Sequence, residues 1–367
     1  MENKRKKLLF FGSDYRVGLT TALTEQILVL NKQPEIELFV VSSEQEMEPG
    51  LHERLQAAGV ERCIVPGLDQ HSDFRHKARQ IADEIDRRGI THVNVHNNWQ
   101  LALLAWIRTA RLTHSRFRLI YTIHGFRHNH PVKAFFAVAI IGGALLLFAD
   151  RVISMSGYVS RKFRFLRYKT SVVYYMMTDP EFARKENPID TSRLSMLFPA
   201  QFRHGKNQKM LVRALARYVE QTGDRTCRLI LPGSGPLWED VRAEAERLGV
   251  SSQVDMPGQL SYKQIIALYE ANNIALVASN SETYGRCIAE PFALGRCLIS
   301  RKVGIAPDII RNGENGFLYD SEQQLAELLV QLGSDRQRIR EVADAAFRDR
   351  TIFSPEKVME SYLKAID

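Results

Sequence analysis

Residues 281–291 read Ser-Glu-Thr-Tyr-Gly-Arg-Cys-Ile-Ala-Glu-Pro and follow a short apolar run over residues 274–278. The apolar run predicts a buried strand, and the apolar residues 288–294 predict a helix after a glycine-bearing loop. This order is typical of ligand sites in α/β folds, which lie at the carboxyl ends of the strands. Glu282 is then expected in the loop and Glu290 about one and a half turns into the helix. A plain helix start with one acid near its positive end accounts for the same residues.

A second strand, loop and helix pattern begins at residue 194. Residues 194–198 read as a strand, and an amphipathic helix pattern runs through Tyr218, so Arg203 and Lys206 are expected in the connecting loop. Such a loop combines free backbone N–H groups, the positive end of a helix dipole and two cations. This chemistry suits a pyrophosphate, although a solvated basic loop has the same composition.

A third pattern ends in a histidine. Residues 117–123 read as a strand that runs directly into His124 and Gly125. A histidine at the carboxyl end of a strand beside a glycine is placed for a ligand, although a lone histidine also serves a purely structural role.

Together these patterns resemble a known family. The Glu-x7-Glu pair, the Phe-Arg-x-Gly-Lys-Asn loop and the Thr-x-His-Gly turn are similar to those of the retaining nucleotide-sugar glycosyltransferases of the GT-B fold, family 4 type. This family includes enzymes of bacterial cell-envelope glycan synthesis. Further stretches that carry the resemblance are residues 12–23, 95–99, 153–156, 231–236 and 315–318.

The resemblance implies an α/β fold with two doubly wound, Rossmann-like parallel-sheet domains that face a central cleft. The first domain would bind the acceptor and the second the nucleotide-sugar donor, with a UDP-sugar expected. The implied reaction is retaining transfer of the sugar to a glycan or lipid-linked acceptor. No cofactor and no metal is expected, because Arg203, Lys206 and backbone dipoles would stabilise the leaving phosphate.

The resemblance also implies roles for individual residues. His124 would contact the sugar near the reacting centre, Arg203 and Lys206 the pyrophosphate, Glu282 the sugar hydroxyls and Glu290 the ribose. The other positions expected to line the binding site are Gly12, Gly18, Gly233, Gly235, Thr283, Tyr284 and Gly285. The chain departs from the family pattern where Tyr174 and Tyr175 replace the usual Asn-Gly that ends the linker strand.

Alternating strand and helix patterns in both halves predict two parallel-sheet domains, which suits 367 residues. We predict an acceptor-binding domain over residues 1–177, a polar, proline-bearing linker over 178–193 and a donor-binding domain over 194–353. A final helix over 354–367 starts with a Ser-Pro signal. The resemblance implies that this helix packs back on the first domain.

The formal net charge of +8 suits anionic partners such as a nucleotide sugar or an acidic membrane surface. Nucleic acid is not expected, because no helix-turn-helix, zinc-finger or RNA-binding aromatic motif is present. The four cysteines are scattered without a CxxC pair, which favours free thiols in a reducing compartment. The basic start of the chain lacks a long apolar segment and is not a secretion signal. The expected location is cytoplasmic, at the inner face of the membrane.

The segment 131–148 is almost wholly apolar and long enough to raise the question of a membrane span. Lys133, the pair Gly142-Gly143 and the strand pattern that follows argue against a span. A core helix and a helix that lies on a membrane surface both fit. The second option gains support from the cluster 161–169, which interleaves cations with aromatic residues.

The sequence argues against one of three alternative functions and leaves the other two open. A nicotinamide oxidoreductase would need G-x-G-x-x-G after a strand, and Trp238 occupies the third glycine position after Gly233 and Gly235. We read the segment 233–236 instead as a tight turn that opens a helix and closely approaches a nucleotide base. A nucleotide-sugar epimerase of the same fold, and a non-catalytic protein that binds glycans or lipid head groups, stay open.

Overall fold

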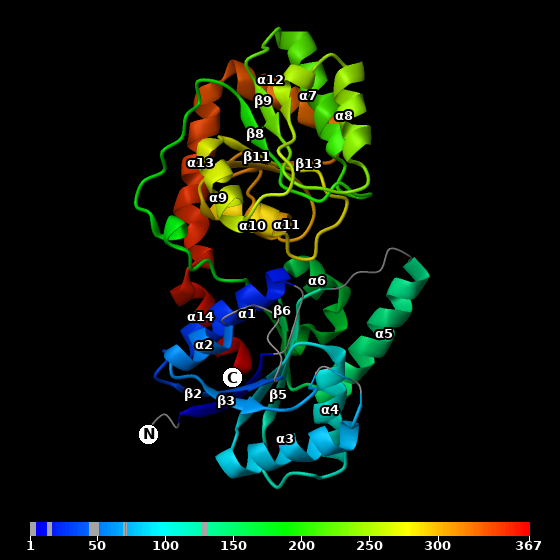
Figure 1. Cartoon of the computed structure of the whole chain (residues 1–367), viewed down its shortest axis with the longest axis vertical. Helices are drawn as coiled ribbons and strands as arrows, with labels where there is room; N and C mark the ends of the chain where they lie inside the picture. Colours follow the sequence, from blue (N-terminus) through cyan, green and yellow to red (C-terminus); the bar gives the residue numbers. More distant parts are fainter. Residues whose placement is uncertain (1–4, 13–16, 44–50, 69, 71, 126–130) are drawn as a thin grey trace. The chain divides into compact units, whose positions relative to one another are not determined.

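The computed structural model describes residues 5–12, 17–43, 51–68, 70, 72–125 and 131–367. Contacts between Cα atoms divide the chain into two compact units (Figure 1). The first unit contains residues up to Met176 together with Ser354–Asp367, and the second contains Met177–Phe353. The final helix, α14 (Pro355–Ile366), therefore folds with the beginning of the chain.

The first unit is built on a parallel sheet with the strand order β3-β2-β1-β4-β5-β6-β7. The registers pair Leu9 with Phe39 on one side and with Val93 on the other. The chain moves outward from β1 in one direction and then resumes on its other side with β4, so the β1–β4 pair is a topological switch point. The strands are β1 (Lys6–Phe11), β2 (Ile36–Ser42), β3 (Glu61–Ile64), β4 (His92–Val95), β5 (Arg118–Ile123), β6 (Arg151–Ser154) and β7 (Thr170–Val172).

Helices cover both faces of this sheet. On one face α3, α4 and α5 pack side by side over a buried apolar core that includes Leu9, Val93 and Leu104 (Figure 1). On the other face α14 contacts α1, β6 and β7. The Tyr362 hydroxyl of α14 donates to Asn94 Oδ1 of β4 at 2.7 Å, and this hydrogen bond holds α14 against the sheet. The helices are α1 (Val17–Leu30), α2 (Leu51–Ala57), α3 (Phe74–Arg88), α4 (Asn98–Thr109), α5 (Pro131–Phe148) and α6 (Gly157–Lys162), with a 3₁₀ segment over Arg164–Lys169.

The second unit repeats this design with the parallel order β10-β9-β8-β11-β12-β13. Its switch point is the β8–β11 pair, where Met196 lies opposite Ile274. The strands are β8 (Ser195–Leu197), β9 (Arg228–Ile230), β10 (Val254–Asp255), β11 (Ile274–Val277), β12 (Cys297–Arg301) and β13 (Phe317–Tyr319). The helices are α7 (Gln208–Thr222), α8 (Trp238–Arg247), α9 (Tyr262–Ala271), α10 (Arg286–Ala293), α11 (Ala306–Ile309), α12 (Glu322–Ser334) and α13 (Arg336–Asp349). Helix α7 packs between α8 and α12, and α10 packs against α13.

The segment 178–193, which the sequence predicts as a linker, is grouped with the second unit. Arg296 explains this, because its guanidinium is almost fully buried and donates to Asn187 Oδ1 and to the Pro188 carbonyl at 3.3 Å. Burial lowers the pKa of Arg296 to about 10. A buried guanidinium is stable only when hydrogen-bond acceptors surround it, so Arg296 holds Asn187 and Pro188 against the rest of the second unit.

The doubly wound parallel fold predicted from the sequence is confirmed in each unit. Helix α5 spans the apolar segment 131–148. Among the described helices, none is long and apolar enough to cross a membrane. All four cysteines are free.

Candidate functional site

The predicted donor loops of the second unit meet at its switch point. The loop after β8 and the loop after β11 are joined by a hydrogen bond from Asn280 N to the Gly205 carbonyl at 2.7 Å. Asn207 adds a second link, because its side-chain amide donates to the Ala278 carbonyl at 2.8 Å. Helix α7 begins directly after Asn207 and α10 directly after Gly285, so both loops also carry the positive end of a helix. Anion-binding groups therefore gather at one point beyond the carboxyl ends of β8 and β11.

Lys206 and Glu282 form an ion pair at this point, although 76 residues separate them in sequence. Both side chains are largely buried, the lysine being 14% and the glutamate 10% exposed. A charge in such a place is stable only with a partner, so each side chain holds the other in position. The pair offers an ammonium for a phosphate and a carboxylate for sugar hydroxyls at adjacent positions.

Arg203 lies in the same loop and is differently placed. Its Nε is buried and has no hydrogen-bond partner among the described residues. An N–H of this kind is costly unless it meets an acceptor, which a bound phosphate would supply. Arg203 thus has an unused donor where the sequence predicts a pyrophosphate contact.

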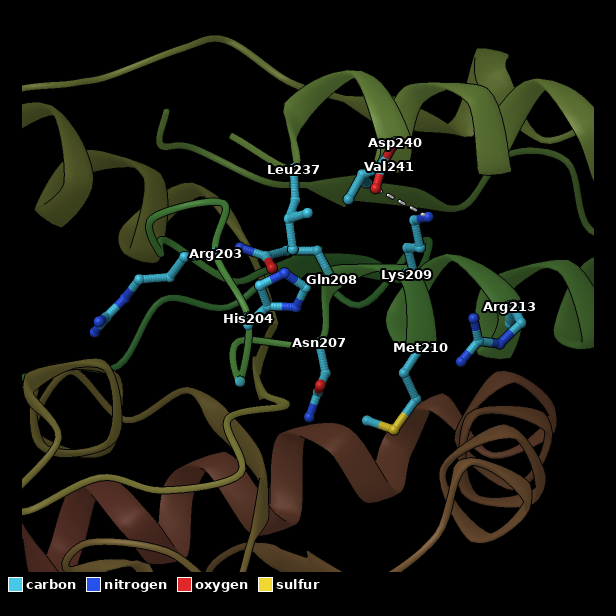
Figure 2. A pocket seen from close by; sticks show the side chains of 11 residues that line it. Arg203, His204, Asn207, Gln208, Lys209, Met210, Arg213, Leu237, Asp240 and Val241 are labelled. Atoms are coloured by element: carbon cyan, nitrogen blue, oxygen red, sulfur yellow. Dashed lines mark ion pairs between the residues drawn. The ribbon is translucent and has the colours of Figure 1, made fainter. Parts of the chain in front are cut away.

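A pocket of about 290 Å³ opens between the start of α7 and the start of α8 (Figure 2). Lys209 and Asp240 form an ion pair at 3.4 Å within it, and the Arg203 side chain extends away from that pair. Neither Lys206 nor Glu282 lines this pocket. The pocket therefore does not include the point where Lys206 pairs with Glu282. Of the residues predicted to bind the donor only Arg203 lines it, so we do not assign the donor to this pocket.

The loop between Glu282 and α10 is held by the loop after β12. The Tyr284 carbonyl accepts from Ile305 N at 3.0 Å, and Gly304 lies so close to that carbonyl that a Cβ would overlap it. Tyr284 is buried, and Gly285 adopts a left-handed conformation with φ 92° directly before α10. Thr283 is partly buried in the same loop. The backbone of this loop is fixed before any ligand arrives.

Glu290 lies one turn into α10 and is 6% exposed at its side chain. Its carboxylate accepts from Arg286 Nε at 2.6 Å. Burial raises the pKa of Glu290, while the Arg286 guanidinium lowers it. Arg286 in turn lies over the Tyr262 ring at 4.7 Å. The Glu290 carboxylate therefore already has Arg286 as a partner. A bound ribose would have to share the carboxylate with Arg286 or displace Arg286 from it.

Gly233 and Gly235 are needed for backbone contact within the protein. Their φ angles are 145° and 150°, and a Cβ at either residue would overlap the carbonyl of Ala200 or Phe202. Two hydrogen bonds join the same segments, from Ala200 N to Pro232 O at 3.0 Å and from Phe202 N to Ser234 O at 2.9 Å. The approach of these glycines to a nucleotide base stays a prediction.

In the first unit His124 is part of a chain of three side chains. His124 Nε2 lies 2.8 Å from His96 Nδ1, and His124 Nδ1 lies 2.6 Å from the Tyr175 hydroxyl. The His124 and Tyr175 rings are stacked at 5.9 Å. His96 follows β4 at the switch point and His124 follows the neighbouring β5. Gly12 directly follows β1 at the same switch point, whereas Gly18 lies in the first turn of α1.

Burial lowers the pKa of His124 to about 3, and that of His96 well below its usual value. Both imidazoles are therefore neutral at pH 7, and each has one donor and one acceptor nitrogen. Two arrangements of the protons fit these distances. In one, the Tyr175 hydroxyl donates to His124 Nδ1, and His124 Nε2 donates to His96 Nδ1. In the other, His96 Nδ1 donates to His124 Nε2, and His124 Nδ1 donates to the Tyr175 oxygen. Both ring nitrogens of His124 are engaged, so a hydrogen bond from this ring to a sugar would replace one protein partner.

His96 and Tyr175 were not predicted as site residues. His96 belongs to the stretch 95–99 that carries the family resemblance, which is a signal for it. Tyr175 stands where the chain departs from the family pattern, and its contact with His124 spans 51 residues. Only the parallel arrangement of β5, β6 and β7 brings these two residues together.

The second unit is similar to a known protein family. Residues 179–349 match the family model of the group 1 glycosyl transferases, and these residues cover nearly the whole unit. A D-inositol 3-phosphate glycosyltransferase of Corynebacterium glutamicum (strain R) is 30% identical over 178 residues. That match covers 47% of this chain and 43% of the relative, so the chain spans less than half the length of this curated relative.

Solved structures match the chain over almost its full length. Anabaena HepE in complex with UDP has a TM-score of 0.72 at 18% identity and covers 98% of both chains. The lipopolysaccharide outer core galactosyltransferase WaaB in its apo form has a TM-score of 0.73 at 17% identity and covers 98% of this chain and 99% of that one. The fold of this chain is accordingly the α/β fold of two Rossmann-like domains found in GT-B glycosyltransferases.

Proposed function

We propose that this chain is a retaining glycosyltransferase of the group 1, family 4 type that moves a sugar from a nucleoside-diphosphate donor. The observation that carries the proposal is the buried Lys206–Glu282 pair at the β8–β11 switch point. It lies within the part of the chain that matches the group 1 family model. The similar fold of HepE, a protein solved with UDP, supports a UDP-sugar as the donor.

The reaction breaks the bond between the anomeric carbon and the leaving phosphate, and negative charge grows on that phosphate. The Lys206 ammonium, the unused Arg203 Nε–H and the start of α10 would stabilise this charge. Glu282 would hold the sugar hydroxyls, and Glu290 the ribose. Retention would follow if the acceptor attacks from the face of the leaving phosphate, which takes the acceptor's proton.

We further propose a glycan or lipid-linked acceptor in cell-envelope polysaccharide synthesis, bound by the first unit near His124. The similar fold of the lipopolysaccharide galactosyltransferase WaaB supports an envelope glycan. The apolar helix α5 and the exposed cations Arg161, Arg164 and Arg167 support a location at the inner face of the membrane.

A donor screen tests the proposal. Purified protein is offered a panel of nucleotide sugars, and thermal shift and nucleoside-diphosphate release are measured with and without a lipid-linked or soluble glycan acceptor. We expect one UDP-sugar to raise the melting temperature and to release UDP in an acceptor-dependent way. Binding without release would favour a non-catalytic role, and conversion of the donor without transfer would favour an epimerase.

The same assay tests metal independence. Lys206, Arg203 and the helix dipoles replace the charge that a divalent cation supplies in other transferases, so transfer should persist in excess EDTA. Complete loss of transfer that magnesium or manganese restores would contradict this expectation.

A further inference from the structure

The outward face of α5 is apolar along its whole length. Phe136, Ile140 and Leu147 are 59%, 71% and 76% exposed, and Val132 and Leu146 lie on the same side of the helix. At 3.6 residues per turn these positions form one stripe. A helix that is apolar all round normally has every face covered. The stripe is therefore a surface whose natural neighbour is apolar.

A groove borders the stripe along α4. Its volume is about 400 Å³, and its lining is almost entirely apolar, with Leu101 and Trp106 on α4 and Ile140, Ala144 and Phe148 on α5. Trp106 is 41% exposed at this groove. Ile140 belongs both to the groove and to the stripe, so the two are continuous. The groove is wide enough for a ligand and has almost no polar group to hold a sugar or a phosphate.

Cations border the stripe on its other side. The exposed ring of Phe165 lies against α5 at Gly142, where a Cβ would overlap it. Lys169 ties the same segment to the helix by donating to the carbonyls of Leu145 and Ala149 at 2.9 and 2.7 Å. Arg164 and Arg167 flank Phe165 on the surface.

Positive charge dominates α5 and the segment packed against it. Residues 131–169 contain seven lysines and arginines and a single acid, Asp150, which pairs with Arg108 at 2.6 Å. The neighbour of the apolar stripe must therefore combine a hydrocarbon interior with anionic groups at its edge. An anionic bilayer has both properties, and a neutral apolar protein face has only the first.

We propose that the stripe of α5 lies in the acyl boundary of an anionic bilayer and that the α4–α5 groove receives one lipid acyl chain. The helix would lie in the plane of the interface, with its apolar face about 5–10 Å into the boundary between head groups and acyl chains. Arg164 and Arg167 would meet the lipid phosphates. This deepens the proposed membrane location, and it is tested without donor or acceptor, so it can fail independently of sugar transfer.

Flotation with vesicles tests the surface. Protein is mixed with phosphatidylcholine vesicles that contain or lack phosphatidylglycerol, at low and high salt. We expect flotation only with the anionic vesicles, weakened by salt. Replacing Arg161, Arg164 and Arg167 by Ser should weaken binding about 100-fold, because each cation near an anionic surface contributes about 1 kcal/mol, or about fivefold. The variant with Phe136, Ile140 and Leu147 replaced by Ser should also lose binding.

A matched control removes the same charge elsewhere. Lys357, Lys364 and Arg242 are exposed cations outside this region, and their replacement by Ser should leave flotation unchanged. Protein that stays unbound on anionic vesicles at low salt overturns the proposal. Loss of binding in the control variant overturns it too, since net charge alone would then explain the effect. Self-association through α5, seen as a dimer that the Ser variant of the stripe abolishes, would likewise overturn it.

Trp106 reports on the groove itself. The Trp99→Phe, Trp238→Phe variant leaves Trp106 as the single tryptophan. We expect phospholipids brominated on the acyl chain to quench its fluorescence in bound protein. Ala102→Phe places a ring at the exposed rim of the groove and should abolish this quenching while flotation persists. Bound protein without quenching, or with equal quenching in both variants, overturns the acyl-chain site.

Discussion

Lys206 and Glu282 stabilise each other in a largely buried position, so neither is an ordinary surface charge. We predict that Lys206→Ala lowers turnover by roughly two orders of magnitude, since loss of one donor to a developing negative charge costs about 3 kcal/mol. Steady-state kinetics measure the effect. Lys209→Ala is the matched control, because Lys209 lies three residues further on and pairs with Asp240 instead. A folded Lys206→Ala protein with unchanged turnover would sink the proposed role.

The two acids should separate kinetically. Glu290→Gln keeps the shape of the side chain but removes the charge that we propose holds the ribose, so we expect mainly a higher donor KM. Glu282→Gln should lower kcat, because contacts near the reacting sugar strengthen in the transition state. It also leaves Lys206 without its counter-charge, so the melting temperature is measured alongside. If both variants keep normal kinetics, the acids have only structural roles.

Contacts between side chains that lie far apart in the chain could not be predicted from the sequence. Residue type and loop position were enough to propose Lys206, Glu282 and His124 as site residues, because cations and acids at strand ends indicate chemistry. The sequence could not show that Lys206 meets Glu282, or that Tyr175 and His96 occupy both nitrogens of His124. Those contacts depend on strand order and register, which local patterns do not contain.

Strands and helices followed their local patterns closely. The sequence pattern predicts a helix over residues 74–88 and a strand over 92–95, and the observed α3 and β4 have these bounds. Asp73 and Gly89 flank the amphipathic run of α3, and β4 is a short strand whose four residues are all buried. By contrast the run over residues 171–175 predicts a strand of that length, whereas β7 spans Thr170–Val172. Its apolar and aromatic run continues past the last paired residue, and Tyr175 turns to His124 instead.

The close contact between the loops after β8 and β9 depends on glycine. We predict that Gly235→Ala destabilises the second unit more than Gly249→Ala does. Gly249 has a φ of 66° with open space around it, so its replacement should cost about 1–2 kcal/mol for backbone conformation alone. At Gly235 the new Cβ also overlaps the Phe202 carbonyl, which adds roughly 1–3 kcal/mol of overpacking. Urea denaturation compares the two, and equal losses would contradict the contact.

The two units share a design but differ in their titratable groups. Nine of the ten histidines precede residue 177, and burial lowers the pKa of His92 to about 4 and that of His124 to about 3. The second unit has instead a buried glutamate, Glu290, whose pKa burial raises. The same fold thus responds to acid in two different ways.

The first unit should be the one that acid destabilises. Its buried histidines have pKa values near 6.5 in the unfolded state and lower values in the folded state, so the unfolded state binds more protons. The free energy of unfolding of the first unit should therefore fall as the pH drops from 7.5 to 5. Glu290 acts in the opposite sense, since its raised pKa makes the folded second unit the better proton acceptor as the pH falls toward that value. Hydrogen exchange followed by mass spectrometry, corrected for the intrinsic effect of pH, should show β4 and β5 losing protection before β8 and β11. Equal loss in both sheets, or earlier loss in β8 and β11, would show that the buried histidines do not control the acid response.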